Sequence, residues 1–182
     1  MGAAVAPKKV KLFCGVISSD GEREIKRKSF EALKGRFGEI DLTSDDMPFD
    51  FSDYYNIEMG DNLERFWISF ERLISPADIA GIKIFTNSIE NGFAVNNKRR
   101  INIDPGYITP SNVILATTKD YSHRIYLSKG IYGEVTTIYN KKTGFTKLPW
   151  SYPDYLSRPA TDFFLKARTE LVKRLKKSRY LF

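Results

Sequence analysis

The residues most suited to chemistry lie between Asn102 and Glu134. This stretch holds the only histidine of the chain, His123, among many Lys, Arg, Tyr and Glu residues. A histidine beside a carboxylate can act as a general acid–base pair, so His123 with Asp104 or Glu134 is a candidate catalytic pair of a hydrolase or transferase. The alternative is that His123 is a hydrogen-bonded structural residue beside structural ion pairs, and we favour that alternative.

The same stretch predicts a site for an anionic ligand, for which we favour a nucleotide or RNA. Basic side chains would hold phosphate, tyrosines would stack on a base, and acids would accept hydrogen bonds from base or sugar. The candidate ligand-binding residues are Tyr107, Lys119, Tyr121 and Arg124, together with Asn87 and Glu90 on a preceding helix. Because Glu90 stands late in that helix and opposes its dipole, either a partner holds it or it is exposed, and we favour exposure.

Several familiar sites are excluded by the sequence. It contains no P-loop, no glycine-rich dinucleotide fingerprint after the first predicted strand and no nucleophile elbow. One histidine and one cysteine cannot supply a zinc centre of the usual ligands. The acidic, aromatic segment 44–63 matches no calcium loop, so we expect a packed surface loop there, or a surface for a protein partner. We therefore predict no cofactor and no metal ion, and we leave open whether the protein is an enzyme.

Composition favours a globular protein. The chain has 182 residues, of which 42% are hydrophobic, and a formal net charge of +7. The charges are unevenly placed, since every charged residue from 38 to 64 is acidic and the C-terminal segment is basic. The basic segment is either a solvated helix face or a surface for an anionic partner. No long apolar run is present, so we expect a soluble, cytoplasmic protein without a membrane segment, in which Cys14 is a core residue.

Hydrophobic periodicity predicts an α+β fold. Strands are expected at 10–18, 39–43, 64–74 and 99–104, and amphipathic helices at 22–37 and 76–93. Ser75, Pro76 and Asp78 mark the start of the second helix. The order β-α-β-β-α-β predicts a ferredoxin-like core in which the strand 10–18 lies between the strands 64–74 and 99–104. We expect one domain over residues 1–182, with 1–7 frayed.

The C-terminal half is expected to extend this core. We predict a short helix at 112–116, a meander of strands at 122–127, 131–139 and 145–150, and a closing helix at 161–179. The sequence Asp-Pro-Gly-Tyr at 104–107 predicts a tight turn that aims Asp104 and Tyr107 at one spot. A second turn is predicted at 152–155.

Several segments resemble one family. The segments I-N-I-D-P-G-Y, L-A-T-T-K-D-Y-S-H-R-I-Y-L, G-I-Y-G-E-V-T and L-P-W-S-Y-P-D-Y are similar to the bacterial and archaeal domain of unknown function 4416, and the resemblance extends over nearly the whole chain. It implies a single-domain boundary. Some members are called GTP-binding proteins, but this sequence lacks the P-loop that the name implies, and the family has no established activity to carry over.

Overall fold

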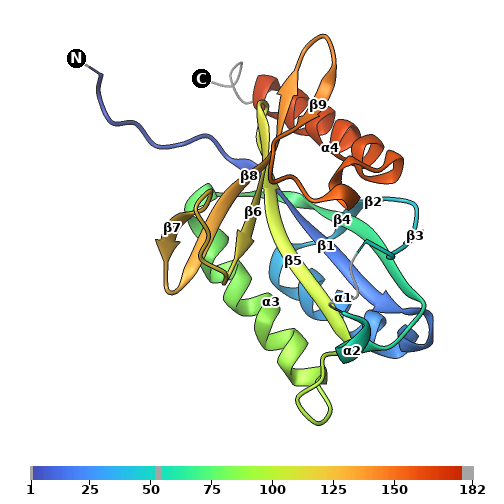
Figure 1. The fold of residues 1–182 in the computed structure, drawn as a ribbon. Coiled ribbons are helices and arrows are strands. Elements are labelled where there is room, and N and C mark those ends of the chain that lie inside the picture. The colour runs from blue at the N-terminus through green and yellow to red at the C-terminus, as the bar shows by residue number, and fades with distance from the viewer. Residues whose placement is uncertain (1, 52–54, 178–182) are drawn as a thin grey trace.

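The computed structural model describes residues 2–51 and 55–177 (Figure 1). Within these residues one nine-stranded antiparallel sheet has the order β2-β4-β1-β5-β6-β8-β7, with β3 paired to β4 and β9 paired to β8. The strands are β1 (Val10–Ser19), β2 (Ile40–Thr43), β3 (Met47–Pro48), β4 (Leu63–Ile74), β5 (Ile101–Ile108), β6 (Asn112–Thr117), β7 (Ile125–Ser128), β8 (Ile131–Asn140) and β9 (Gly144–Lys147). The helices are α1 (Arg23–Phe37), α2 (Asn56–Met59), α3 (Ile79–Phe93) and α4 (Arg158–Lys177), with 3₁₀ segments η1 (Asp20–Glu22), η2 (Pro76–Asp78) and η3 (Pro153–Leu156). The fold is therefore α+β, as predicted.

The sheet separates two cores. Side chains alternate between the faces of β1, so Leu12 and Cys14 pack with α1 and α3, whereas Phe13 packs with α4. Figure 1 shows α4 (red) beside β9. The strand β1 lies between β4 and β5, which is the predicted neighbour relationship. Residues 2–9 form no helix or strand, and no helix in the described part of the chain is both long and apolar enough to span a membrane.

The start of the second long helix is confirmed. The Ser75 side chain accepts a hydrogen bond from the backbone N–H of Ala77, and the Asp78 carboxylate accepts one from the N–H of Ser75. This reciprocal pair satisfies N–H groups that the first helical turn leaves without partners. The capping residues therefore set where the helix begins, and with that which side chains of α3 lie against β5.

The predicted helix at 112–116 is wrong, because these residues form strand β6. The Thr109 hydroxyl accepts hydrogen bonds from the N–H groups of Ser111 and Asn112, as an N-cap would. Here the contact closes a turn between β5 and β6. The residues that follow alternate in burial, with Val113 and Leu115 buried, and pair with β5 and β8.

The predicted turn at 104–107 is also wrong, because β5 continues through it. Pro105 lies opposite Cys14, and Gly106 lies opposite Phe13 on one side and Leu115 on the other. A Cβ atom at Gly106 would overlap the carbonyl oxygen of Ile114 and the ring of Phe13. The glycine therefore permits a close approach between strands and makes no left-handed turn.

Other predicted elements shift in position. Strand β7 begins at Ile125, so His123 and Arg124 precede it, whereas the predicted strand began at residue 122. The predicted turn at 152–155 is largely the 3₁₀ segment η3. In the acidic segment 44–63 the rings of Phe49, Phe51 and Tyr55 pack edge to face, and residues 52–54 lie outside the described residues, as do 178–179 of the predicted closing helix.

Candidate functional site

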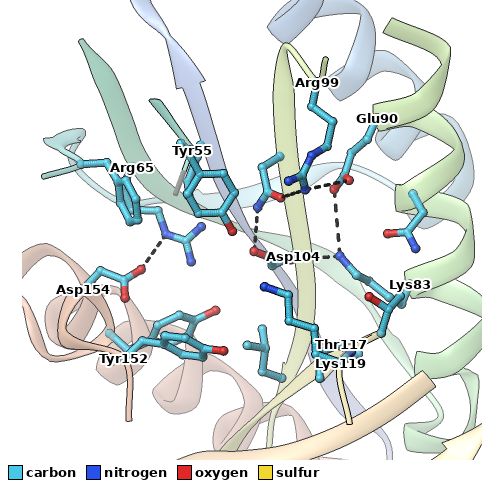
Figure 2. Close-up of a pocket in the computed structure, with 18 of the residues that line it drawn as sticks. Tyr55, Arg65, Lys83, Glu90, Arg99, Asp104, Thr117, Lys119, Tyr152 and Asp154 are labelled. Carbon is cyan, nitrogen blue, oxygen red and sulfur yellow. Dashed lines mark hydrogen bonds and ion pairs between the residues drawn. The ribbon is translucent and has the colours of Figure 1, made fainter. Parts of the chain in front are cut away.

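A cavity of about 490 Å³ lies where β5 and β6 separate (Figure 2). The two strands pair only from Gly106 onward. Backbone groups alternate sides along a strand, so the nitrogen of Pro105 faces the same side as that of Ile103, and proline has no N–H to donate there. The pairing therefore begins after Pro105. The cavity is lined by this open part of β5, the end of β6, α3, η3 and the aromatic residues that precede α2.

The helix α3 satisfies the open edge of β5. The Glu90 carboxylate accepts a 2.6 Å hydrogen bond from the N–H of Ile103, and Lys83 Nζ donates to the carbonyl of Ile103 at 3.2 Å. Lys83 Nζ also donates to Asp104 Oδ1 at 2.9 Å, and Asn102 Nδ2 donates to Asp104 Oδ2 at 2.7 Å. The side chains of Glu90 and Lys83 thus replace the hydrogen bonds of a missing strand. The same contacts hold Lys83, Glu90 and Asp104 at the cavity wall.

This environment shifts the pKa values of Glu90 and Asp104 in opposite directions. Burial raises the pKa of Glu90 to about 7, against the attraction of Lys83. Burial alone would also raise the pKa of Asp104, but the charges of Lys83 and Arg65 outweigh it, and the pKa falls below the ordinary value. For Lys83, burial is outweighed by Asp104 and Glu90, so its pKa is raised and it stays protonated. Near neutral pH the wall therefore presents a carboxyl group that exchanges its proton beside a carboxylate that stays ionised.

An arginine connects α2 to this wall. Arg99 Nε and Nη2 donate to the two oxygens of Glu58 at 2.8 and 2.6 Å, and Arg99 Nη1 donates to Asn102 Oδ1 at 2.8 Å. Its guanidinium lies 5.5 Å from the ring centre of Tyr55, which also lines the cavity. The bidentate pair therefore holds the aromatic segment against β5.

The opposite wall contains a buried arginine. Arg65 is 2% exposed, and its Nε lies 3.0 Å from Asp154 Oδ2. Its guanidinium is stacked near the rings of Trp67 and Tyr155, at 4.9 and 5.5 Å from their centres. Burial raises the pKa of Asp154 in spite of the arginine. Figure 2 shows the guanidinium pointing from β4 toward the interior of the cavity.

A glycine makes room for this arginine. Gly15 lies opposite Trp67 on β4 and opposite Asp104 on β5. A Cβ atom at Gly15 would come within 2.7 Å of Arg65 Nη2 and 2.9 Å of its Cζ. The guanidinium therefore lies directly over the backbone of β1, where only glycine leaves space for it.

Buried donors on this wall lack hydrogen bonds within the part of the chain that the structure describes. They are Arg65 Nε, Arg65 Nη1 and the hydroxyl of Tyr155, of which Nε keeps its ion-pair contact with Asp154. Both residues line the cavity. A buried donor without an acceptor costs about 1–3 kcal/mol, and more when it is charged. An acceptor that enters the cavity would recover this free energy.

Residues 8–171 match the model of the family described as Domain of unknown function (DUF4416). The chain belongs to this family. No curated protein and no solved structure matches it. The family description assigns no chemistry to this DUF4416 chain.

The predicted site residues divide into two groups and one outlier. Asn87, Glu90, Asp104 and Lys119 line the cavity. Glu90 is 4% exposed, so the prediction that it is solvent-exposed is wrong. Tyr107 lies three residues after Asp104 on a continuous strand, faces the opposite side of the sheet and packs against the core of α1 and α3. The prediction that the two converge is therefore wrong.

The second group consists of Tyr121, His123, Arg124 and Glu134, none of which is among the described residues that line the cavity. His123 Nε2 is 3.2 Å from Glu134 Oε2, and Arg124 Nε donates to the same oxygen at 2.7 Å. The His123 ring stacks between Trp150 and Tyr121, with ring centres 5.2 and 6.1 Å away. The side chain of Glu134 is completely buried, so this is a packed polar cluster.

This cluster supports the cavity wall. Arg124 Nη2 donates to the hydroxyl of Tyr152 at 2.7 Å, and Arg124 Nη1 donates to the carbonyl of Lys119 at 3.0 Å. Tyr152 and Lys119 both line the cavity. The predicted partner Asp104 bonds to Lys83 and Asn102, so it belongs to the wall formed by α3 and β5.

Four residues that line the cavity were not among the predicted site residues: Arg65, Lys83, Arg99 and Asp154. In the strand predicted at 64–74, Arg65 alternates with Phe66, Ile68 and Phe70, a pattern typical of a half-buried strand whose other face meets solvent. In the structure that face is covered by α4 and η3, so Arg65 and Trp67 are buried. The signal available in the sequence was Trp67, because a large aromatic residue on a supposedly solvent-exposed face indicates a second covered face.

Proposed function

We propose that the cavity binds a small anionic ligand and that this ligand is a mononucleotide. The observation that carries the proposal is the buried Arg65 guanidinium, whose Nη1 has no partner among the described residues and which points into the cavity. A phosphate oxygen would accept from Arg65 and from the hydroxyl of Tyr155, and would give the guanidinium a second anionic partner beside Asp154.

The remaining wall suits the rest of a nucleotide. Tyr55 and Tyr152 line the cavity from different segments, and each offers a ring on which a base can stack. Asn87 and Asn91 on α3 add amide donors and acceptors for base or sugar. Among the described residues, four basic side chains and three carboxylates line the cavity, which suits a ligand with an anionic end and hydrogen-bond donors elsewhere. A cavity of about 490 Å³ is in the usual range for small-molecule sites.

Binding is best tested by titration calorimetry with AMP, GMP, CMP and UMP at low salt. We expect at least one of them to bind, and we expect Arg65→Lys to weaken it at least tenfold, because lysine keeps the charge and loses the guanidinium fork. A double variant, Arg65→Gln with Asp154→Asn, removes the charge without leaving an unpaired carboxylate. Lys142→Gln in the exposed turn between β8 and β9 is the control and should bind normally. Unchanged affinity in folded Arg65 variants would overturn the proposal.

Binding of a short single-stranded RNA, the alternative ligand, is measured in parallel. RNA bound across the basic surface should lose affinity steeply as salt increases, because phosphate contacts release counterions. If the RNA binds and all four mononucleotides fail to bind at millimolar concentration, the ligand is RNA and the mononucleotide proposal is wrong.

The contact between His123 and Glu134 favours a second candidate, a hydrolase or transferase that uses this pair. The 3.2 Å separation of Nε2 and Oε2 is within reach of proton transfer. The pair is less suited to the role than its spacing suggests, because Arg124 shares the same carboxylate oxygen. For the acidic segment 44–63 we favour a role as a cavity wall over a role in binding a protein partner, since Phe49, Phe51 and Tyr55 line the cavity.

The arrangement of the core supports one finer structural proposal. The order β2-β4-β1-β5, with α1 and α3 packed against one core, is the order expected of a ferredoxin-like unit. We propose that these elements form such a unit and that β6 to β9 extend it. The cavity would then lie at the junction between the unit and its extension.

A further inference from the structure

Two carboxyl groups of different character share one wall of the cavity. Glu90 Oε1 is fixed by the N–H of Ile103, while Oε2 has Arg99 Nη1 as its neighbour at 3.8 Å. Asp104 is held by Lys83 and Asn102 and keeps 23% of its side-chain surface exposed. Lys83 Nζ lies between the two carboxyl groups, 2.9 Å from Asp104 and 4.0 Å from Glu90.

The two groups differ in their protonation near neutral pH. Burial raises the pKa of Glu90 to about 7, whereas the net effect of burial, Lys83 and Arg65 lowers the pKa of Asp104. The charged groups that act on Glu90 are Lys83 from its own helix, Asp104 from β5 and Arg99 from the segment before β5. A site with one proton-carrying carboxyl and one ionised carboxylate has the components of acid–base catalysis.

The position of this pair relative to Arg65 decides which bond it can reach. Figure 2 shows Arg65 and Asp154 on one side of the cavity, Glu90 and Lys83 on the opposite side, and Asp104 between them. A nucleotide whose phosphate contacts Arg65 therefore directs its sugar and base toward Asp104 and Glu90. In that orientation Glu90 lies on the side of the cavity opposite the anchored phosphate, and Asp104 lies between the two sides, where the sugar and its glycosidic bond would be.

We propose that this cavity hydrolyses the N-glycosidic bond of a nucleoside 5′-monophosphate, with Glu90 as proton donor to the leaving base and Asp104 as base for the attacking water. The proposal rests on the proposed mononucleotide site. Cleavage of this bond develops positive charge on the sugar, which neighbouring carboxylates stabilise, whereas phosphoryl transfer develops negative charge.

The step balances as a hydrolysis. The bond between C1′ and the base nitrogen breaks, its electron pair leaves with the base, and that nitrogen takes the proton of Glu90. The oxygen of water bonds to C1′, and one water proton passes to Asp104. The products are the free base and ribose 5-phosphate, and no electrons are gained or lost. Transfer of the proton from Asp104 back to Glu90 through solvent restores the starting state.

The test incubates the full chain with each common nucleoside 5′-monophosphate and measures free base by chromatography and ribose 5-phosphate as reducing sugar. We expect release of base from at least one substrate. Glu90→Gln and Asp104→Asn should each lower kcat about 100-fold or more with little change in KM, because general acid–base catalysis contributes factors of this size. Arg65→Lys should mainly raise KM, and Lys142→Gln should behave as wild type. The wild-type rate should fall as pH rises above 7, when Glu90 loses its proton.

Each outcome separates this inference from the binding proposal. Nucleotides that bind in calorimetry but release no base over a day overturn the glycosidase inference and leave the mononucleotide site in place. Absence of any nucleotide binding overturns both. Base release that persists in folded Glu90→Gln removes Glu90 from the reaction. If one carboxyl variant fails to fold, as judged by circular dichroism, the other variant and the wild-type pH profile decide the question.

Discussion

Glu90 accepts a 2.6 Å hydrogen bond from the backbone N–H of Ile103, and through this contact a helix side chain takes the place of a strand. Pro105 ends the pairing of β5 with β6, and the part of β5 that precedes it needs other partners. Lys83 and Glu90 supply them from α3. The break in strand pairing at Pro105 leaves part of β5 without a neighbouring strand, and the side chains that bond to it form the charged wall of the cavity.

We expect Glu90→Gln to change how stability depends on pH. The pKa of Glu90 is about 7 in the folded protein and about 4.3 in an unfolded chain, so the folded state holds the proton more tightly. This stabilisation is complete below about pH 4.3 and is lost as pH rises through about 7. Glutamine does not ionise. Relative to wild type, the variant should therefore gain up to roughly 3 kcal/mol between pH 5 and pH 8.

Urea denaturation at pH 5, 6, 7 and 8 measures this gain. The exposed Glu31→Gln on α1 is the control, and its difference from wild type should stay small across the range. Parallel pH profiles for wild type and Glu90→Gln would show that Glu90 ionises normally in the folded protein.

Gly15→Ala should displace the guanidinium of Arg65. The new methyl group would lie 2.7 Å from Nη2, and the side chain has little room to move because it is enclosed by Trp67, Tyr155 and Asp154. We expect a loss of about 1–3 kcal/mol in unfolding free energy together with weaker binding of mononucleotides.

Gly35→Ala is the matched control for this variant. Gly35 lies on the exposed side of α1 and has no neighbour within 4 Å of an added Cβ, so alanine there should be neutral or stabilising by up to about 1 kcal/mol. Nucleotide affinity that survives Gly15→Ala unchanged would argue against Arg65 as the anion ligand.

Gly106→Ala tests whether this glycine serves close packing or a turn. The added Cβ would overlap a backbone carbonyl of β6 and the ring of Phe13, neither of which can move without disturbing the sheet. We expect a loss of about 3 kcal/mol, near the upper end for overpacking in a core. Chemical denaturation beside Gly81→Ala, which has open space on α3, measures the difference. A loss below about 0.5 kcal/mol would contradict the close approach of β5 and β6.

The sequence predicted elements whose signals are local. The continuous apolar run of β1 and the capping residues of α3 were interpreted correctly, because each pattern depends on neighbours in the chain. The same kind of local pattern gave a wrong prediction at Thr109. Its hydroxyl accepts hydrogen bonds from two N–H groups, but the contact closes a turn between two strands and does not begin a helix. Both outcomes have the same hydrogen bonds, so the local sequence does not separate them.

The site itself depends on pairing that the sequence does not reveal. Asp104 and Lys119 were predicted, yet other residues that line the cavity come from β4, α3 and η3, which meet only through the register of the sheet and the placement of α4. Arg65 looked solvent-facing because α4 covers the second face from nearly a hundred residues away. Asp104, Pro105 and Gly106 were singled out for a turn, whereas their importance lies in where the strands separate.

His123→Ala distinguishes a supporting role for the histidine from a catalytic one. The ring contacts Glu134 at 3.2 Å and stacks against Trp150, while 20% of the side chain is exposed. Removing it should cost about 1–2 kcal/mol of unfolding free energy, because a hydrogen bond and a ring contact are lost. Arg124 still holds Glu134 and Tyr152 in the variant, so mononucleotide affinity should change less than threefold.

Tyr121→Ala, which removes an exposed ring from the other side of the histidine, serves as control and should cost under about 0.5 kcal/mol. Urea denaturation and nucleotide titration of the same preparations measure both quantities. Full stability combined with lost activity would instead assign catalysis to His123 and Glu134, and would favour the second candidate function over the wall formed by α3 and β5.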